Sequence, residues 1–229
     1  MTASGRIPIL LLPGMDGTGE LLEDLAGRLS PSRPVHIVSY PLDKPLRYDD
    51  LTAFATARAP KERFAILGES FSGPVAIEIA ASQPQAAGLI LASSFAWHPA
   101  PSLLAPFARL LDLRRMPAWI ADAALLGATG TPELRARLHA LLKKLPREIV
   151  QARAAAALRV DKRNRLREIA CPVMCLHGRF DRVTGKRCLR QILLAQPRCQ
   201  LRRFDAAHML LETHPVEAAR AIDKFCGGL

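Results

Sequence analysis

Short runs of hydrophobic residues alternate along the chain with longer stretches in which hydrophobic residues recur at helical spacing. Glycine, proline or polar residues bound the short runs, which is typical of buried strands. The expected strands are Ile7–Leu12, Val35–Ser39, Phe64–Gly68, Leu89–Ser93, Pro172–His177 and Gln200–Phe204. The expected helices lie near Glu20–Leu29, Asp49–Ala59, Phe71–Ser82, Lys186–Ala195 and Pro215–Phe225. Strands and helices that alternate at this spacing predict a parallel sheet with helices on both faces.

The alternation stops between Ala96 and Glu168. This stretch is helical in composition, holds no strand candidate and is divided into short pieces by prolines. We therefore expect residues 1–95 and 169–229 to form an α/β core, with residues 96–168 inserted as a helical cap. Such a cap would lie over the carboxyl ends of the strands, where open α/β folds bind ligands.

Composition excludes several classes of protein. With 49% hydrophobic and 23% charged residues, the chain is globular rather than disordered. No apolar stretch reaches the roughly 18 residues that a membrane-spanning helix needs. The hydrophobic run before Pro13-Gly14 is too short for a signal peptide. An odd number of cysteines, 5, argues against a secreted disulfide framework. We expect free thiols and a cytoplasmic protein.

A glycine-rich loop, Pro13-Gly14-Met15-Asp16-Gly17-Thr18-Gly19, follows the first expected strand. A phosphate-binding loop would continue with Lys and then Ser or Thr, but Glu20 and Leu21 stand there, so no side chain offsets the phosphate charge. In a dinucleotide-binding loop, G-x-G-x-x-G, the shorter interval between glycines comes first. Here the longer interval, Gly14 to Gly17, precedes the shorter one, Gly17 to Gly19. The loop therefore has another role.

The segment Gly68-Glu69-Ser70-Phe71-Ser72-Gly73 joins a buried strand to a helix. It places Ser70 on a sharp turn between small neighbours, as a nucleophilic serine of the G-x-S-x-G type requires. Ser72 occupies the position of the second glycine in that pattern, and Gly73 follows it. A serine that caps a helix is the alternative interpretation.

A serine becomes a nucleophile when a histidine removes its proton and a carboxylate holds that histidine. Asp181 lies just beyond the fifth expected strand, and His208 lies beyond the sixth. Since the carboxyl ends of parallel strands share one edge of a sheet, Ser70, Asp181 and His208 can meet there. Asp205 is the alternative acid, only three residues before His208.

Taken together, these segments resemble the alpha/beta hydrolases of the serine type. Gly68–Gly73 is similar to the nucleophile turn of the family, His177-Gly178-x-x-Asp181 to its acid loop, and Ala207-His208 to its histidine loop. Leu12–Gly17 resembles the oxyanion loop, although Pro13 replaces the usual histidine. The family's first antiparallel strands have no counterpart, so a six-stranded, mostly parallel sheet flanked by helices is expected.

The resemblance implies cleavage of carboxylic esters through an acyl-enzyme on Ser70, with His208 as the base and Asp181 as its partner. It also implies an oxyanion hole made by the backbone N–H groups of Met15 and Phe71. Ordinary turns at Gly14 and Gly17 remain the alternative for that loop. No cofactor and no metal are required by this chemistry.

Other functions use the same residues. An acyl-thioesterase or an acyltransferase differs only in the leaving group or the acceptor. A noncatalytic ligand-binding module on the same fold is the alternative from another class. The expected partner is a small acyl ester. Trp97 and Trp119 are candidate substrate-binding residues, although aromatic residues in a cap more often form its core.

Positive charge is concentrated in the inserted segment. Residues 96–168 carry 14 Lys and Arg against 6 Asp and Glu, within a chain whose net charge is +11. The densest run is Arg159, Lys162, Arg163, Arg165 and Arg167. A solvated helix face is one interpretation. The other is a basic rim at the entrance that attracts an anionic acyl carrier, either CoA or an acidic carrier protein. Nucleic acid is not expected, because no recognition helix accompanies the charge.

Overall fold

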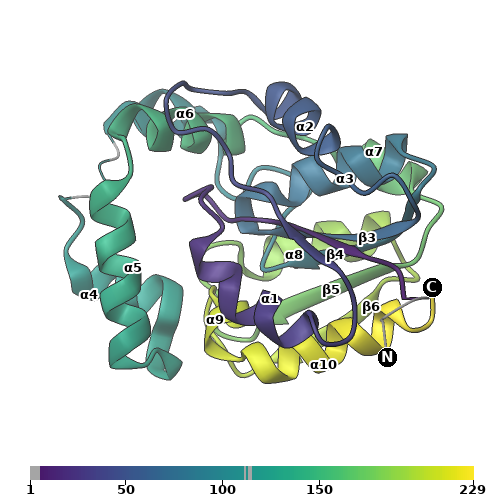
Figure 1. The fold of residues 1–229 in the computed structure, drawn as a ribbon. Coiled ribbons are helices and arrows are strands. Elements are labelled where there is room, and N and C mark those ends of the chain that lie inside the picture. Colours follow the sequence, from purple (N-terminus) through teal and green to yellow (C-terminus); the bar gives the residue numbers. More distant parts are fainter. Residues whose placement is uncertain (1–5, 111, 113–114) are drawn as a thin grey trace.

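The computed structural model describes residues 6–110, 112 and 115–229, and its centre is one six-stranded sheet. Every strand is parallel to its neighbours, in the order β2-β1-β3-β4-β5-β6 (Figure 1). The strands are β1 (Ile9–Leu12), β2 (Val35–Ile37), β3 (Phe64–Glu69), β4 (Ala86–Ala92), β5 (Val173–Gly178) and β6 (Gln200–Phe204). The prediction of a six-stranded, parallel α/β fold is confirmed.

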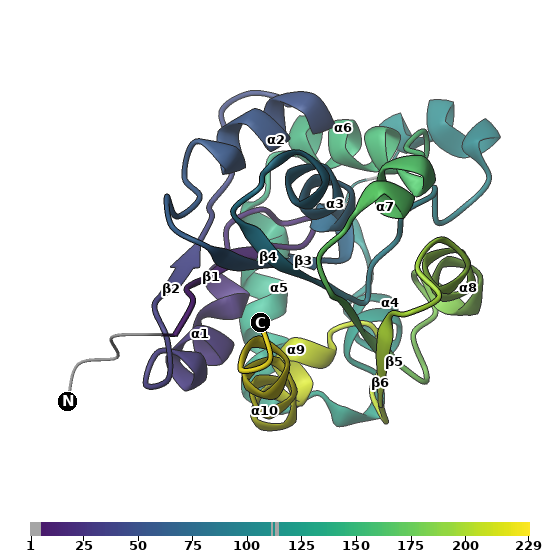
Figure 2. The same cartoon turned by 90° about the vertical axis from the view of Figure 1, so that its right-hand side faces the viewer.

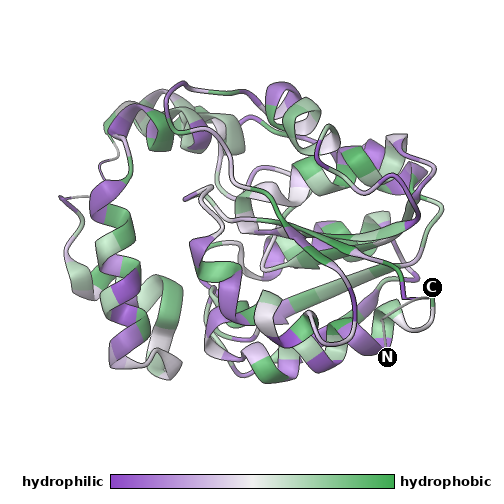
Figure 3. Cartoon of the chain, viewed as in Figure 1, coloured by the Kyte–Doolittle hydropathy of each residue, from purple (hydrophilic) through white to green (hydrophobic). Residues whose placement is uncertain are grey.

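Helices cover both faces of this sheet (Figure 2). One face carries α2 (Tyr48–Thr56), α3 (Gly73–Ser82) and α8 (Gly185–Ala195). The other carries α1 (Glu23–Leu29), α9 (Leu210–Thr213) and α10 (Pro215–Cys226). The central strands are therefore apolar on both faces, which is why they read as continuous hydrophobic runs and appear green in Figure 3.

The strand order places the ligand crevice. The chain passes from β1 to β2 on one side and then returns to β3 on the other side of β1. A sheet that reverses in this way opens a crevice beyond the carboxyl ends of the two strands between which the order reverses. Here those strands are β1 and β3, which are followed by the glycine-rich loop and by Ser70.

The inserted segment, residues 96–168, is helical in the part that the structure describes, apart from an isolated bridge between Trp97 and Asp161. It contains η3 (Ser102–Leu110), α4 (Ala118–Ala121), η5 (Asp122–Leu126), η6 (Gly127–Thr129), α5 (Pro132–Lys144), α6 (Arg147–Ala157) and α7 (Arg163–Glu168). The bridge closes the insertion where it leaves and rejoins the core. Helices α4 and α5 lie beyond the carboxyl ends of the strands, whereas α7 lies beside α3 (Figure 1).

Cysteines and helix lengths complete the description. All five cysteines are free thiols; Cys175, Cys188 and Cys226 are buried, and Cys171 and Cys199 are half-buried. Within the described residues, no helix combines the length and the apolar character needed to cross a bilayer.

Candidate active site

Ser70 occupies a strained turn between β3 and a short 3-10 helix, η2 (Ser70–Ser72). Its φ is 45°, a left-handed conformation that non-glycine residues rarely adopt. The turn is tight because Gly68 packs against the next helix; a Cβ on Gly68 would lie 2.7 Å from Cβ of Ala76. The requirement for small residues, read from the sequence, therefore has a steric cause here.

Side chains around the turn hold it in this conformation. The Ser94 hydroxyl donates a 2.6 Å hydrogen bond to the Ser70 carbonyl oxygen. Ser72, which replaces the second glycine of the pattern, donates to the Pro13 carbonyl and lies 2.9 Å from the Tyr40 hydroxyl. Tyr48 donates to the Phe71 carbonyl at 3.0 Å. The Ser72 contact also ties the turn to the glycine-rich loop.

The three residues expected to meet at the sheet edge do meet. Ser70 Oγ lies 2.8 Å from His208 Nε2, and His208 Nδ1 lies 3.1 Å from both carboxylate oxygens of Asp181. An ionised carboxylate only accepts hydrogen bonds, so the ring proton sits on Nδ1 and leaves Nε2 free to accept from Ser70. This is the geometry of a general base next to a nucleophile.

Asp181 is held in its ionised form. Burial alone would raise the pKa of Asp181, but hydrogen bonds from His208 and Thr184 outweigh it and keep the pKa well below its usual range. The Thr184 hydroxyl donates at 2.6 Å, and the Val183 amide donates at 2.8 Å. Asp205, the alternative acid, is mostly exposed and pairs with Arg179 at 3.1 Å instead.

Two backbone N–H groups belong to residues that lie close to Ser70. Within the described residues, the Met15 N–H has no hydrogen-bond acceptor, and Met15 lines the cavity next to Ser70. The Phe71 N–H belongs to the first turn of η2, where amides lack intrahelical acceptors. Free N–H groups beside a nucleophile are the donors that an oxyanion requires.

Two buried carboxyl groups lie beneath the glycine-rich loop. Glu69 accepts a 3.1 Å hydrogen bond from the Gly14 amide, and its buried neighbour is the carboxyl of Glu212 on α9. The Glu212 oxygens are buried and receive no N–H or hydroxyl donor of suitable geometry from the described residues. Two neighbouring buried carboxyl groups are costly to ionise together, which favours a protonated form of the pair. Burial raises the pKa of Glu69 well above its usual range, and burial raises the pKa of Glu212 to about 7.

This pair predicts how stability depends on pH. The pKa of Glu212 in the folded protein lies above its unfolded value of about 4.3. Its contribution to the free energy of unfolding is therefore fully present below about pH 4.3 and is lost as the pH rises to about 7. We expect Glu212→Gln to make the free energy of unfolding fall less steeply with pH, by at most about 1.4 kcal/mol per pH unit. Urea unfolding at about pH 5 and about pH 8 measures it. Glu217→Gln, an exposed change on α10, should leave the slope as in the wild type.

Arg153 on α6 connects the insertion to the glycine-rich loop. It is 3% exposed, and its guanidinium donates to the carbonyls of Met15 at 2.9 Å, Asp16 at 2.7 Å and Pro41 at 3.2 Å. It lies so close to Gly17, whose φ is 75°, that a Cβ there would be 2.2 Å from Nη1. Arg153 therefore fixes the backbone that directly follows the Met15 amide.

We expect Arg153→Met to lower kcat for ester hydrolysis by roughly 10-fold to 100-fold while KM changes little, because a displaced Met15 amide affects the transition state most. Arg153→Lys should recover part of the loss. Steady-state kinetics checks this, with Arg137→Met as the control. Arg137 also donates from the insertion to a core carbonyl, that of Glu20, but on the exposed surface. Equal losses of kcat in both variants would contradict the role of Arg153.

A cavity of about 310 Å³ opens directly above Ser70. Its polar lining is Asp16, Glu69, Ser70 and His208, and nearly all of the rest is hydrophobic. The core contributes Met15, Leu21, Val183 and Met209, and the insertion contributes Met116, Ile120, Ala121, Ala124, Leu125, Leu138, Leu141, Leu142 and Leu145. The space beside the serine thus suits an apolar group.

Neither tryptophan lines this cavity, contrary to the prediction. Trp97 stacks on His98 and lies under the guanidinium groups of Arg163 and Arg187 at the base of the insertion. Trp119 is 71% exposed on the outer face of α4. The face of α4 that meets the cavity carries Ile120 and Ala121 instead.

The basic run of residues 159–167 does not lie around the cavity either. Because α7 packs beside α3, Lys162 and Arg165 form ion pairs with Glu78 of that helix at 2.9 Å. Arg163 pairs with Asp161 at 2.6 Å. The expected basic rim at the entrance is therefore wrong for this run, three of whose five cations pair with neighbouring carboxylates.

Comparison with known proteins agrees with this geometry. The model of one family, described as the alpha/beta hydrolase family, matches residues 9–221. The chain belongs to the alpha/beta hydrolase family. No curated protein matches the sequence.

Several solved structures share the fold at low sequence identity. An enol-lactonase from Burkholderia xenovorans LB400 is 15% identical with a TM-score of 0.82, over 100% of this chain and 92% of that one. A hydrolase from Pseudomonas aeruginosa PA01 is 20% identical with a TM-score of 0.83, covering 99% and 92%. A thermophilic esterase from Thermogutta terrifontis is 20% identical with a TM-score of 0.78, covering 97% and 90%.

Sequence reasoning missed Arg153, Glu212 and the role of Glu69. Glu69 carried a signal, because a carboxylate at the end of a fully buried strand needs a partner. Arg153 carried a weaker one, as the charged residue within the alanine-rich stretch 152–157 of α6. Glu212 offered none, since one acidic residue in a short helix is ordinary.

Proposed function

We propose that the protein is a serine hydrolase that cleaves carboxylic esters with an apolar acyl group. The observation that carries the proposal is the hydrogen-bonded series from Ser70 through His208 to Asp181 at the mouth of an apolar cavity. Families of this fold carry many chemistries, so the proposal depends on these residues rather than on the fold.

In the proposed reaction, the Ser70 oxygen attacks the ester carbonyl while His208 Nε2 takes its proton. The Met15 and Phe71 amides bind the oxygen that becomes negative. The alcohol then leaves with the proton from His208, and an acyl group remains bonded to Ser70. Water, deprotonated by His208, attacks this acyl-enzyme and releases the acid. Asp181 stabilises the charged imidazole in both steps.

The cavity predicts the acyl group. Its volume of about 310 Å³ is at the lower end of ligand pockets, and its walls offer almost no hydrogen-bonding groups. Two of the structurally similar proteins are described as an esterase and an enol-lactonase, both of which open carboxylic esters. A medium-length alkyl chain therefore fits the site better than a polar or very long one.

A series of nitrophenyl butyrate, octanoate and palmitate tests this. Each buried methylene contributes up to about 0.8 kcal/mol, so kcat/KM should rise up to roughly fourfold per carbon until the cavity is filled, and then fall. Octanoate should be the best of the three. Ala124→Phe, which narrows the cavity, should shift the optimum to butyrate, whereas Ala123→Phe on the exposed side should not.

Three further measurements distinguish the other functions. Octanoyl thioesters hydrolysed faster than octanoyl esters would identify a thioesterase, and acyl transfer to an added alcohol would identify an acyltransferase. A fluorophosphonate that fails to label Ser70 would favour a noncatalytic ligand-binding module.

A further inference from the structure

A second cavity, of about 700 Å³, lies between α8 and the carboxyl ends of β5 and β6. Every ionisable residue that lines it is basic: His177, Arg179, Lys186, Arg190 and Arg203. The remaining wall is hydrophobic and consists of Leu189, Leu193 and Leu194 on α8. Ser70 does not line this cavity, so it is separate from the candidate active site.

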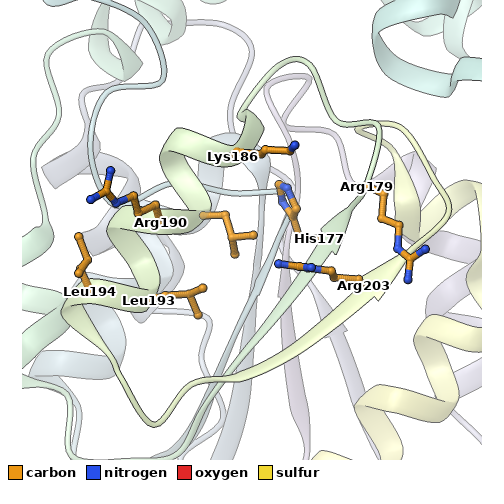
Figure 4. Close-up of a pocket in the computed structure, with 8 residues that line it drawn as sticks. His177, Arg179, Lys186, Arg190, Leu193, Leu194 and Arg203 are labelled. Atoms are coloured by element: carbon orange, nitrogen blue, oxygen red, sulfur yellow. The ribbon is translucent and has the colours of Figure 1, made fainter.

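Three of the basic groups converge inside it. His177 and Arg203 are register partners on adjacent parallel strands, so both side chains face α8. Figure 4 shows the nitrogen ends of Lys186 and Arg203 pointing toward His177, whereas the Arg179 guanidinium points away. Arg179 pairs with Asp205 at 3.1 Å. In the part of the chain that the structure describes, no carboxylate lies within ion-pair distance of Lys186, Arg190 or Arg203.

His177 adds an observation of a different kind. It is only 5% exposed, yet within the described residues neither ring nitrogen has a hydrogen-bond partner. Burial lowers the pKa of His177, and the charges of Arg203 and His208 add to this effect against that of Asp181. The ring nitrogens therefore face the cavity without a protein partner and can hydrogen-bond to a ligand bound there, beside the charge of Arg203.

We propose that this cavity binds a small phosphate monoester whose other end is apolar. The phosphate would accept hydrogen bonds from His177, Lys186 and Arg203, and the apolar end would lie on the leucines of α8. The concave shape and the leucine wall favour a small molecule over a nucleic acid backbone, which charge alone would attract.

Calorimetry with 1-naphthyl phosphate at low salt tests the proposal. The probe should bind at least about tenfold more tightly than inorganic phosphate or 1-naphthol, because only the ester supplies both contacts. The Lys186→Ser, Arg203→Ser double variant should lose at least about tenfold in affinity. The control double variant Arg198→Ser, Arg202→Ser loses the same net charge and should bind as the wild type. Ser70→Ala should also bind normally, which separates this site from ester hydrolysis.

Binding should also change the titration of His177. The groups that face this ring are Lys186 and Arg190 of α8, Arg203 of β6, and Asp181 and His208 of the neighbouring loops. A bound phosphate adds negative charge, so the pKa of His177 should rise when the probe saturates the site. NMR of the ring protons measures this, and His177→Gln identifies the signal. An unchanged His177 titration, or equal losses of affinity in the two double variants, would overturn the proposal.

A phosphate monoester can be a soluble molecule or a lipid. Sedimentation with vesicles that contain phosphatidic acid separates these sources. Co-sedimentation that disappears in the Lys186→Ser, Arg203→Ser variant supports the site with a lipid ligand, and binding of 1-naphthyl phosphate without co-sedimentation supports it with a soluble one.

Discussion

Ser70→Ala should lower kcat/KM for nitrophenyl octanoate by at least ~10³-fold while the protein remains folded. The hydroxyl at this position lies 2.8 Å from His208 Nε2, which is the proton acceptor that the proposed reaction requires. Replacement of a serine with φ of 45° by alanine removes one oxygen and retains the turn. Initial rates on purified protein measure the loss, and circular dichroism checks the fold.

Ser93 provides a matched control. It follows β4 as Ser70 follows β3, and its φ of 44° is almost the same. Its hydroxyl, however, is buried and has no hydrogen-bond partner. Ser93→Ala should keep activity within a few-fold of the wild type and should still be labelled by a fluorophosphonate. Retained turnover in folded Ser70→Ala, or a loss of the same size in Ser93→Ala, would remove Ser70 as the nucleophile.

Much of the fold could be predicted because its elements are local. A strand buried on both faces must be apolar at every position, so β1, β3, β4 and β5 stand out in the sequence without reference to their neighbours. Strand ends were less predictable. The second strand ends at Ile37 rather than Ser39, because pairing with β1 ends there and the chain turns toward Tyr40.

The path of the insertion could not be predicted, because it depends on contacts between distant residues. Nothing local in Arg163–Glu168 indicates that α7 would leave the insertion and pack beside α3. In that position Leu166 of α7 is buried in the core, and the Glu78 carboxylate pairs with both Lys162 and Arg165. The pKa of Glu78 is lowered by these two cations against the effect of its partial burial. Charge counted along the sequence therefore misplaced the basic surface.

The residues that meet around Ser70 likewise divide into those that local sequence predicts and those that depend on distant contacts. Ser70, Asp181 and His208 each follow a recognisable strand, so their meeting at one sheet edge follows from parallel topology alone. Arg153 reaches the glycine-rich loop across 137 residues of sequence. Glu212 meets Glu69 only because α9 packs against the other side of the strand ends. Partners of this kind depend on tertiary packing and leave no periodic signal.

The identity of the acid predicts the second large effect. Asp181→Asn should lower kcat by roughly 10³-fold to 10⁴-fold, whereas Asp205→Asn should change it by only a few-fold. An amide at position 181 can donate a hydrogen bond to His208 Nδ1, which places the ring proton on Nε2. Nε2 then points a proton at Ser70 and no longer accepts one. Asp205 follows β6 on the exposed surface and pairs with Arg179, so its loss leaves the ring unchanged.

Kinetics at neutral pH compares the two variants directly. The Thr184 hydroxyl and the Val183 amide also donate hydrogen bonds to the Asp181 carboxylate. Urea unfolding must therefore show that Asp181→Asn is folded under assay conditions. Asp181→Glu provides a further check, because it keeps the charge but moves it away from Nδ1, and it should retain more activity than the asparagine variant. A greater loss of activity in Asp205→Asn than in Asp181→Asn would show that Asp205, not Asp181, is the acid. The hydrogen bonds at 3.1 Å between His208 and Asp181 favour the opposite order.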